Sequence, residues 1–140
     1  MTSPHLERLV QAGQLKAETI GEQELARLLA MGERLLADSR NSNLSLEGRF
    51  LIAYDASYAF ATAALRHHGY RSSSRYIAFQ CLEHTAGLSP AQWRVLALCH
   101  ERRNEATYEG TARIDETLIA NLIEIVEMLR SRWPPHRVSS

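Results

Sequence analysis

The chain has 140 residues, 23% of them charged, and its 16 lysines and arginines balance its 16 aspartates and glutamates. This length favours one domain with a single core, and the balanced charge excludes a global electrostatic attraction to nucleic acid or membrane, so any anion site must be local. Cys81 and Cys99 lack metal-ligand spacing, and no window approaches the roughly 18 apolar residues of a membrane span, so we expect a cytoplasmic protein with reduced thiols, no metal and no cofactor.

The N-terminal part of the chain predicts a short helix and then a longer one. An apolar pattern after Pro4 indicates one or two helical turns, and we assign residues 1–18 to an N-terminal arm. Residues 19–22 have the pattern of a capping box and predict the start of the longer helix. Gly32 inside that helix is either tolerated or used for close packing.

The middle of the chain predicts the longest helix and a weaker one after it. Apolar or small residues trace one helical face from Leu46 to Leu65, and Gly69 stands where a glycine ends a helix. The next segment, residues 75–86, has only moderate amphipathicity and ends at Gly87.

Two further helices are predicted in the C-terminal part. The segment Ser89-Pro90-Ala91-Gln92 combines an N-cap serine, proline at the first helical position and glutamine three residues after the cap, which is the sharpest helix start in the chain. A last helix is predicted over residues 112–133, and we expect residues 134–140 to form a flexible tail.

Strand patterns are hard to find, so the sequence predicts an all-α fold. We expect an antiparallel bundle of four main helices over residues 19–133, plus the short N-terminal helix, because short connections make neighbouring helices antiparallel. The last helix has more apolar surface than one packed face needs, and Tyr54, Tyr58 and Trp93 are large amphipathic side chains. A homodimer interface and a thicker monomeric core both account for this surface.

Residues 102–108 carry charge on a helical face that should be apolar. The stripe formed by Trp93, Leu96 and Ala97 continues with polar or charged side chains at His100, Arg103, Asn104 and Thr107. Since an uncompensated buried charge costs several kcal/mol, an arginine at this place needs an anionic partner or an interface. We interpret Arg103, Asn104 and His100 as ligand-binding residues. The alternative is a structural ion pair between Arg103 and Asp55 or Glu101.

Three segments carry a resemblance to a known family: residues 53–58 (AYDASY), 65–71 (LRHHGYR) and 103–108 (RNEATY). Together they resemble the HEPN superfamily, the nucleotide-binding helical domains of prokaryotes and higher eukaryotes, over roughly residues 45–130. The resemblance implies a helical bundle that dimerises with its motif helices facing a shared cleft. Many members are metal-independent ribonucleases of toxin–antitoxin or defence systems, and others bind or act as scaffolds without catalysis. It therefore implies RNA or a nucleotide as ligand and an antitoxin as a candidate partner.

The family motif consists of an arginine, a polar residue and a histidine a few residues further on. Arg103 and Asn104 match its first half, but Tyr108 stands at the histidine position. Histidine suits proton transfer because its pKa lies near neutrality, whereas tyrosine titrates near about 10. The resemblance thus implies Arg103 and Tyr108 as the catalytic positions, with the phosphate-binding half retained and the proton-transfer half altered.

The sequence leaves three functions open. The preferred one is a HEPN-like homodimer that binds RNA or a nucleotide phosphate through Arg103, with weak or no catalysis. The others are a metal-independent endoribonuclease and a protein-interaction bundle without a nucleic-acid role. Arg103 and Tyr108 lie about 140° apart around a regular helix. They can therefore act together only if the helix loosens near Gly110 or if they come from different protomers.

Overall fold

The computed structural model describes residues 3–111 and 113–135. Its elements, in chain order, are α1 (Pro4–Gln11), β1 (Lys16–Ala17), α2 (Glu22–Ser39), α3 (Leu46–His67), β2 (Tyr70–Arg71), α4 (Arg75–Gln80), α5 (Leu82–Thr85), α6 (Pro90–Asn104), the π-helical turn η1 (Glu105–Glu109) and α7 (Glu116–Ser131). The two strands form one small antiparallel ladder, in which Lys16 faces Arg71 and Ala17 faces Tyr70. The predicted all-α class is therefore confirmed, apart from this short ladder.

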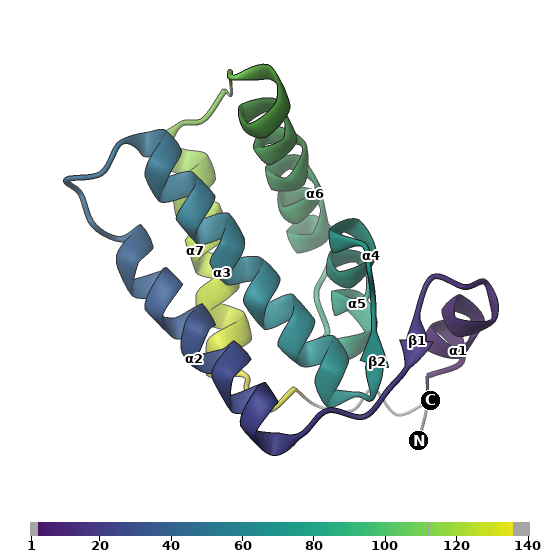
Figure 1. The fold of residues 1–140 in the computed structure, drawn as a ribbon. Helices are drawn as coiled ribbons and strands as arrows, with labels where there is room; N and C mark the ends of the chain where they lie inside the picture. Colours follow the sequence, from purple (N-terminus) through teal and green to yellow (C-terminus); the bar gives the residue numbers. More distant parts are fainter. Residues whose placement is uncertain (1–2, 112, 136–140) are drawn as a thin grey trace.

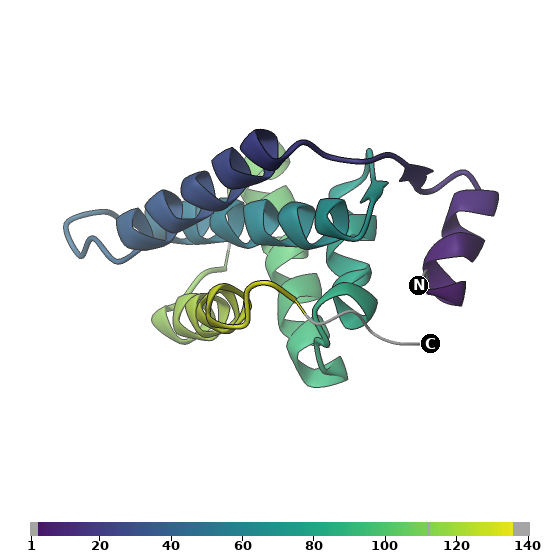
Figure 2. The same cartoon turned by 90° about the horizontal axis from the view of Figure 1, so that it is seen from below.

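Helix α3 is the central helix of the fold, as the burial of side chains on all its sides shows. Figure 1 shows α2 and α3 side by side, and Figure 2 shows α7 below this pair, where it contacts both helices. Phe50, Tyr54 and Phe60 of α3 are at most 2% exposed. They share one core with buried residues of the neighbouring helices, among them Leu36, Phe79, Leu96, Leu122 and Val126.

Gly32 allows α2 to approach α3 closely. A Cβ atom at this position would lie 2.8 Å from Cε2 of Phe60, closer than side chains pack, and two other ring atoms would lie within 3.2 Å. The absence of a side chain therefore lets the Phe60 ring lie against the backbone of α2. Of the two interpretations from the sequence, close packing is the one that the structure supports.

The N-terminal arm is attached to the rest of the chain by a small second core. Leu6 and Leu15 are buried with Leu65 and Tyr70, and the Tyr70 hydroxyl donates a hydrogen bond of 2.6 Å to Oε1 of Glu7. The β1–β2 ladder joins the same two parts of the chain. In Figure 1, α1 lies at one end of the molecule, beyond these strands.

The capping box predicted at residues 19–22 is wrong. Helix α2 begins at Glu22, and its N-cap residue is Gly21, which has no side chain to cap the helix. The preceding residues have another role: the guanidinium group of Arg66 donates to the carbonyl oxygens of Glu18 and Thr19. This tertiary contact holds the segment before α2 in a conformation that the local pattern does not reveal.

Two other predicted helices differ in their bounds. The segment expected as one helix over residues 75–86 is divided at Cys81 into α4 and α5. The last helix begins at Glu116, where the carboxylate of Asp115 accepts a hydrogen bond of 2.8 Å from the Leu118 amide, and not near residue 112. Residue 112 and most of the expected tail, residues 136–140, lie outside the described part of the chain.

The two cysteines are buried free thiols, and burial raises the pKa of each to about 12. Both side chains thus pack as small apolar groups in the core. Among the helices that the structure describes, none is long and apolar enough to cross a membrane.

Candidate functional site

Helix α6 presents the predicted binding residues, and its start is fixed by the predicted capping box. Ser89 Oγ accepts a hydrogen bond of 3.2 Å from the Gln92 amide, and Gln92 Oε1 accepts one of 3.0 Å from the Ser89 amide. With the start fixed, the helical repeat places His100, Arg103 and Asn104 on one face. This face lies toward α3 and α4, since His100 contacts Tyr54 of α3 and Tyr76 of α4.

The hydroxyl group of Tyr54 is the centre of the cluster. Tyr54 is 1% exposed, and its Oη lies 2.9 Å from Nδ1 of His100. The guanidinium carbon of Arg103 is 5.7 Å from the centre of the Tyr54 ring, and that of Arg75 is 5.8 Å from it. Two cations from different helices therefore contact one buried aromatic ring, an arrangement that cation–π attraction stabilises. We call Tyr54, Arg75, His100, Arg103 and Asn104 the Tyr54 cluster.

The hydrogen bonds along α6 define the proton positions in the cluster. Arg103 Nη1 lies 3.4 Å from Asn104 Oδ1, and since a guanidinium group can only donate, this atom must be the amide oxygen. Asn104 Nδ2 then donates to His100 Nε2, also at 3.4 Å. With Nε2 as an acceptor, neutral His100 carries its proton on Nδ1 and donates it to the Tyr54 oxygen. The Tyr54 proton remains available to donate to another group.

The charge of the cluster resides on its arginines. Burial, together with the positive charges of Arg103 and Arg75, lowers the pKa of His100 below its usual value of 6.5. Burial also raises the pKa of Tyr54, although the two arginines act in the opposite direction. Both groups are therefore neutral at pH 7, and the local field is positive.

One of the two arginines is only partly compensated, and the other is not compensated at all within the described residues. Arg75 Nη1 lies 3.5 Å from Oδ1 of Asp55 but is buried without a hydrogen bond to any described residue. Arg103 has no carboxylate within 4.0 Å in the described part of the chain. The predicted alternative of an ion pair with Asp55 or Glu101 is absent there. Asp55 lies 3.5 Å from Arg75, and Glu101 lies 3.8 Å from Arg102.

Tyr108 does not join the cluster. The helix does loosen where the sequence suggested, since Glu105–Glu109 form a π-helical turn that ends at Gly110, which has a φ of 72°. However, Tyr108 is 77% exposed, and the contacts of Arg103 involve Asn104 and Tyr54 instead. Arg103 and Tyr108 of one chain therefore form no common site in this structure.

The other histidines lie apart from the cluster. His84 stacks on His5, with 4.0 Å between ring centres, and His67 lies against Trp133 with 5.5 Å between ring centres. Among residues 3–111 and 113–135, no group of three or more histidine, cysteine, aspartate and glutamate side chains could hold a metal ion.

Sequence reasoning missed Arg75 and the central role of Tyr54. Tyr54 stood out only as a large amphipathic side chain, and Arg75 only as the first residue of a weak helix. One signal was present, because the segment 53–58, one of the three that suggested the resemblance, includes Tyr54. Nothing local in the sequence indicated that α4 would bring a second arginine to the same ring.

Comparisons with protein-family models, with curated proteins and with solved structures find no match for this chain. The residues of the Tyr54 cluster and their geometry therefore carry the functional argument.

Proposed function

We propose that this chain is a HEPN-like module that binds RNA or a nucleotide through a phosphate group at the Tyr54 cluster, with weak or no catalysis. In this proposal the four main helices α2, α3, α6 and α7 form the antiparallel bundle of that family. Two chains form a homodimer in which the ends of the α6 helices face a common cleft. The exposed Tyr108 of one chain would then approach the cluster of the other chain. Arg103 and Tyr108, which point in different directions from one helix, would thus meet across the dimer.

The charge of Arg103, a half-buried side chain, is the observation that carries the proposal. Its guanidinium group is held over the Tyr54 ring and lacks a carboxylate partner among the described residues. Arg75 adds a second cation with a buried nitrogen that makes no hydrogen bond there, and Tyr54 adds a hydroxyl proton. A phosphate group would supply the anionic oxygens that Arg103 lacks and that Arg75 has only in part, and guanidinium groups bind it in a bidentate manner.

Aromatic side chains beside the cluster support a nucleotide over a free phosphate. Tyr76 is 45% exposed, its ring centre lies 5.9 Å from that of His100, and Trp93 lies 5.4 Å beyond it. A base can stack on such a ring while its phosphate reaches the arginines, which is the usual arrangement in proteins that bind single strands.

Weak or absent catalysis follows from the proton-transfer groups at hand. RNA cleavage without a metal needs one group to take the 2′-hydroxyl proton and another to protonate the leaving oxygen. The cluster contains one histidine, and its Nδ1 and Nε2 are both engaged in hydrogen bonds. Tyrosine is a poor base at pH 7 because its pKa lies near about 10.

One observation favours the alternative function of a metal-independent endoribonuclease. His100 lies in the cluster, one helical turn before Arg103, and it is neutral at pH 7 as a general base must be. If the chain is a ribonuclease, His100 would replace the histidine that the family motif has in the place of Tyr108. A toxin–antitoxin role with an antitoxin partner would follow from that activity.

The test is the affinity for a single-stranded RNA oligonucleotide, measured by fluorescence anisotropy for the wild type, Arg103→Ala and Arg102→Ala. Arg102 is the matched control, because it has the same charge and its Nη1 is 3.2 Å from the carboxylate of Glu105. Loss of charged hydrogen bonds should weaken binding by about tenfold to a hundredfold in Arg103→Ala, and much less in Arg102→Ala. The slope of log K against log salt should fall by about 0.7 for each phosphate contact removed from single-stranded RNA.

Other outcomes would select another function. Equal losses in Arg103→Ala and Arg102→Ala would reduce the interaction to general charge attraction and contradict the proposed site. RNA cleavage that disappears in both Arg103→Ala and His100→Gln would establish the endoribonuclease. A wild-type protein that binds no RNA and no nucleotide would favour the protein-interaction bundle, and a monomer in solution would contradict the shared cleft.

A further inference from the structure

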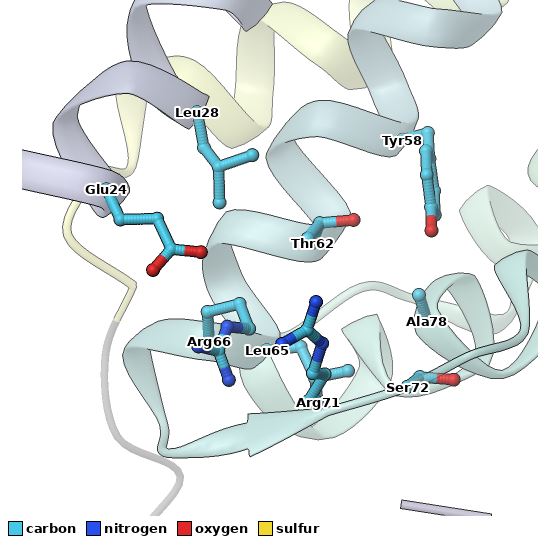
Figure 3. A pocket seen from close by; sticks show the side chains of 9 residues that line it. All are labelled: Glu24, Leu28, Tyr58, Thr62, Leu65, Arg66, Arg71, Ser72 and Ala78. Carbon is cyan, nitrogen blue, oxygen red and sulfur yellow. The ribbon is translucent and has the colours of Figure 1, made fainter. Parts of the chain in front are cut away.

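A cavity of about 180 Å³ opens between α2, α3, α4 and the segment after β2. Figure 3 shows its lining: Leu28 and Leu65 contribute apolar surface, and the side chains of Thr62, Arg66 and Arg71 contribute polar groups. We call this cavity the Arg66 pocket. None of the five residues of the Tyr54 cluster lines it.

The buried hydroxyl group of Thr62 lacks a hydrogen-bond partner. Its Oγ1 is buried and has no hydrogen-bond partner among the described residues. In Figure 3 it points into the pocket, above the guanidinium group of Arg71. Buried hydroxyl groups in native proteins nearly always have a partner, since leaving them without one costs free energy. This site therefore lacks an acceptor for the Thr62 proton.

The guanidinium groups of the pocket also lack sufficient negative charge. Arg66 has a side chain only 6% exposed, and its Nη1 lies 3.4 Å from Oε2 of Glu18. Arg71 Nη1 lies 3.1 Å from the same carboxylate oxygen. Both guanidinium groups thus rely on one carboxylate. Glu24 also lines the pocket, but no ion pair joins its exposed carboxylate to either arginine among the described residues.

We propose that the Arg66 pocket binds a small oxyanion, a carboxylate or a phosphate with a short apolar substituent. The anion oxygens accept hydrogen bonds from the Thr62 hydroxyl and from Arg71, whose exposed side chain can move to meet them. The apolar part lies on Leu28 and Leu65. The volume of about 180 Å³ gives room for a small ligand of this kind.

The test measures thermal stability in the Arg103→Ala background, in which anion binding at the Tyr54 cluster is weakened. Sodium butyrate and sodium phosphate are the probes, and sodium chloride at equal ionic strength is the control. A ligand at ten times its Kd should raise the Tm by about 5 °C. A rise in Tm with butyrate but not with phosphate identifies a carboxylate ligand, and a rise with phosphate but not with butyrate identifies a phosphate ligand.

Two variants locate the effect. Thr62→Val keeps the side-chain shape and removes the unpartnered hydroxyl, so its Tm without ligand should be unchanged or higher while the ligand-induced rise is largely lost. Arg71→Gln should also reduce the rise, and it avoids Arg66, whose removal would release the chain before α2. The proposal is overturned if neither probe exceeds the chloride control, or if both variants keep the full rise. These results are independent of RNA binding at the Tyr54 cluster.

Discussion

Removal of the Tyr54 hydroxyl tests whether the hydrogen bond to His100 organises the cluster. Tyr54→Phe keeps the aromatic ring, which packs against Phe79 with 5.5 Å between ring centres, and it keeps the surface that Arg75 and Arg103 contact. It deletes the 2.9 Å hydrogen bond and leaves Nδ1–H of His100 without its acceptor. The loss of this bond and the desolvated partner should lower the free energy of unfolding by about 1–3 kcal/mol.

The assay is a double-mutant cycle by urea unfolding, followed by circular dichroism. In the His100→Ala background the same Tyr54→Phe change should cost much less, which gives a coupling energy of about 1 kcal/mol or more. Tyr58→Phe is the matched control, because Tyr58 also packs on Phe79 and contacts Arg75, but its hydroxyl has no hydrogen bond within the described residues. If the effects of Tyr54→Phe and His100→Ala on the free energy of unfolding are additive, or if Tyr58→Phe costs as much as Tyr54→Phe, the hydrogen bond to His100 does not organise the cluster.

Three further predictions concern packing and protonation. Gly32→Ala should lower the free energy of unfolding, measured in urea, by about 1–2 kcal/mol, since the clash with Phe60 outweighs the gain in helix propensity. An equal or higher free energy of unfolding would contradict the close approach of α2 to α3. Thr85→Val should raise the Tm, since Thr85 is 0% exposed and its hydroxyl has no hydrogen-bond partner in the described part of the chain. Removing this hydroxyl should raise the free energy of unfolding by about 1 kcal/mol. A lower Tm would indicate that a bound water satisfies the hydroxyl. Burial and nearby arginines lower the pKa of His100. Just below pH 6.5 the folded protein therefore binds fewer protons than the unfolded chain. The free energy of unfolding should thus fall as the pH decreases through that value. The slope should be shallower in His100→Gln, and an unchanged slope would exclude His100 as its source.

Local signals predicted the helices where the capping residues act alone. The capping box at Ser89 needs only residues of its own turn, and both of its hydrogen bonds form as expected. The predicted box at residues 19–22 failed because Arg66, far away in the sequence, binds the carbonyl groups before α2. The break at Cys81 was also not predicted by periodicity, and Cys81 itself is buried in the small core that includes Leu6 and Leu15 of the N-terminal arm.

The candidate site was predictable to the extent that it lies on one helix. The spacing of His100, Arg103 and Asn104 was enough to place them on a common face, and their hydrogen bonds follow that spacing. The contribution of Arg75 depends on how α4 packs on α3, which no local pattern encodes. The position of Tyr108 was predicted only through the resemblance, and its exposure leaves that role untested.

The most direct test of the central claim, that a phosphate binds at the Tyr54 cluster, is an NMR titration of the His100 side chain with an RNA dinucleotide. Without ligand, the imidazole should be neutral with its proton on Nδ1. A bound phosphodiester brings negative charge next to His100, so its pKa should rise on binding, and the rise should be lost in Arg103→Ala. Saturation with the dinucleotide while the His100 resonances and pKa stay unchanged would contradict the account.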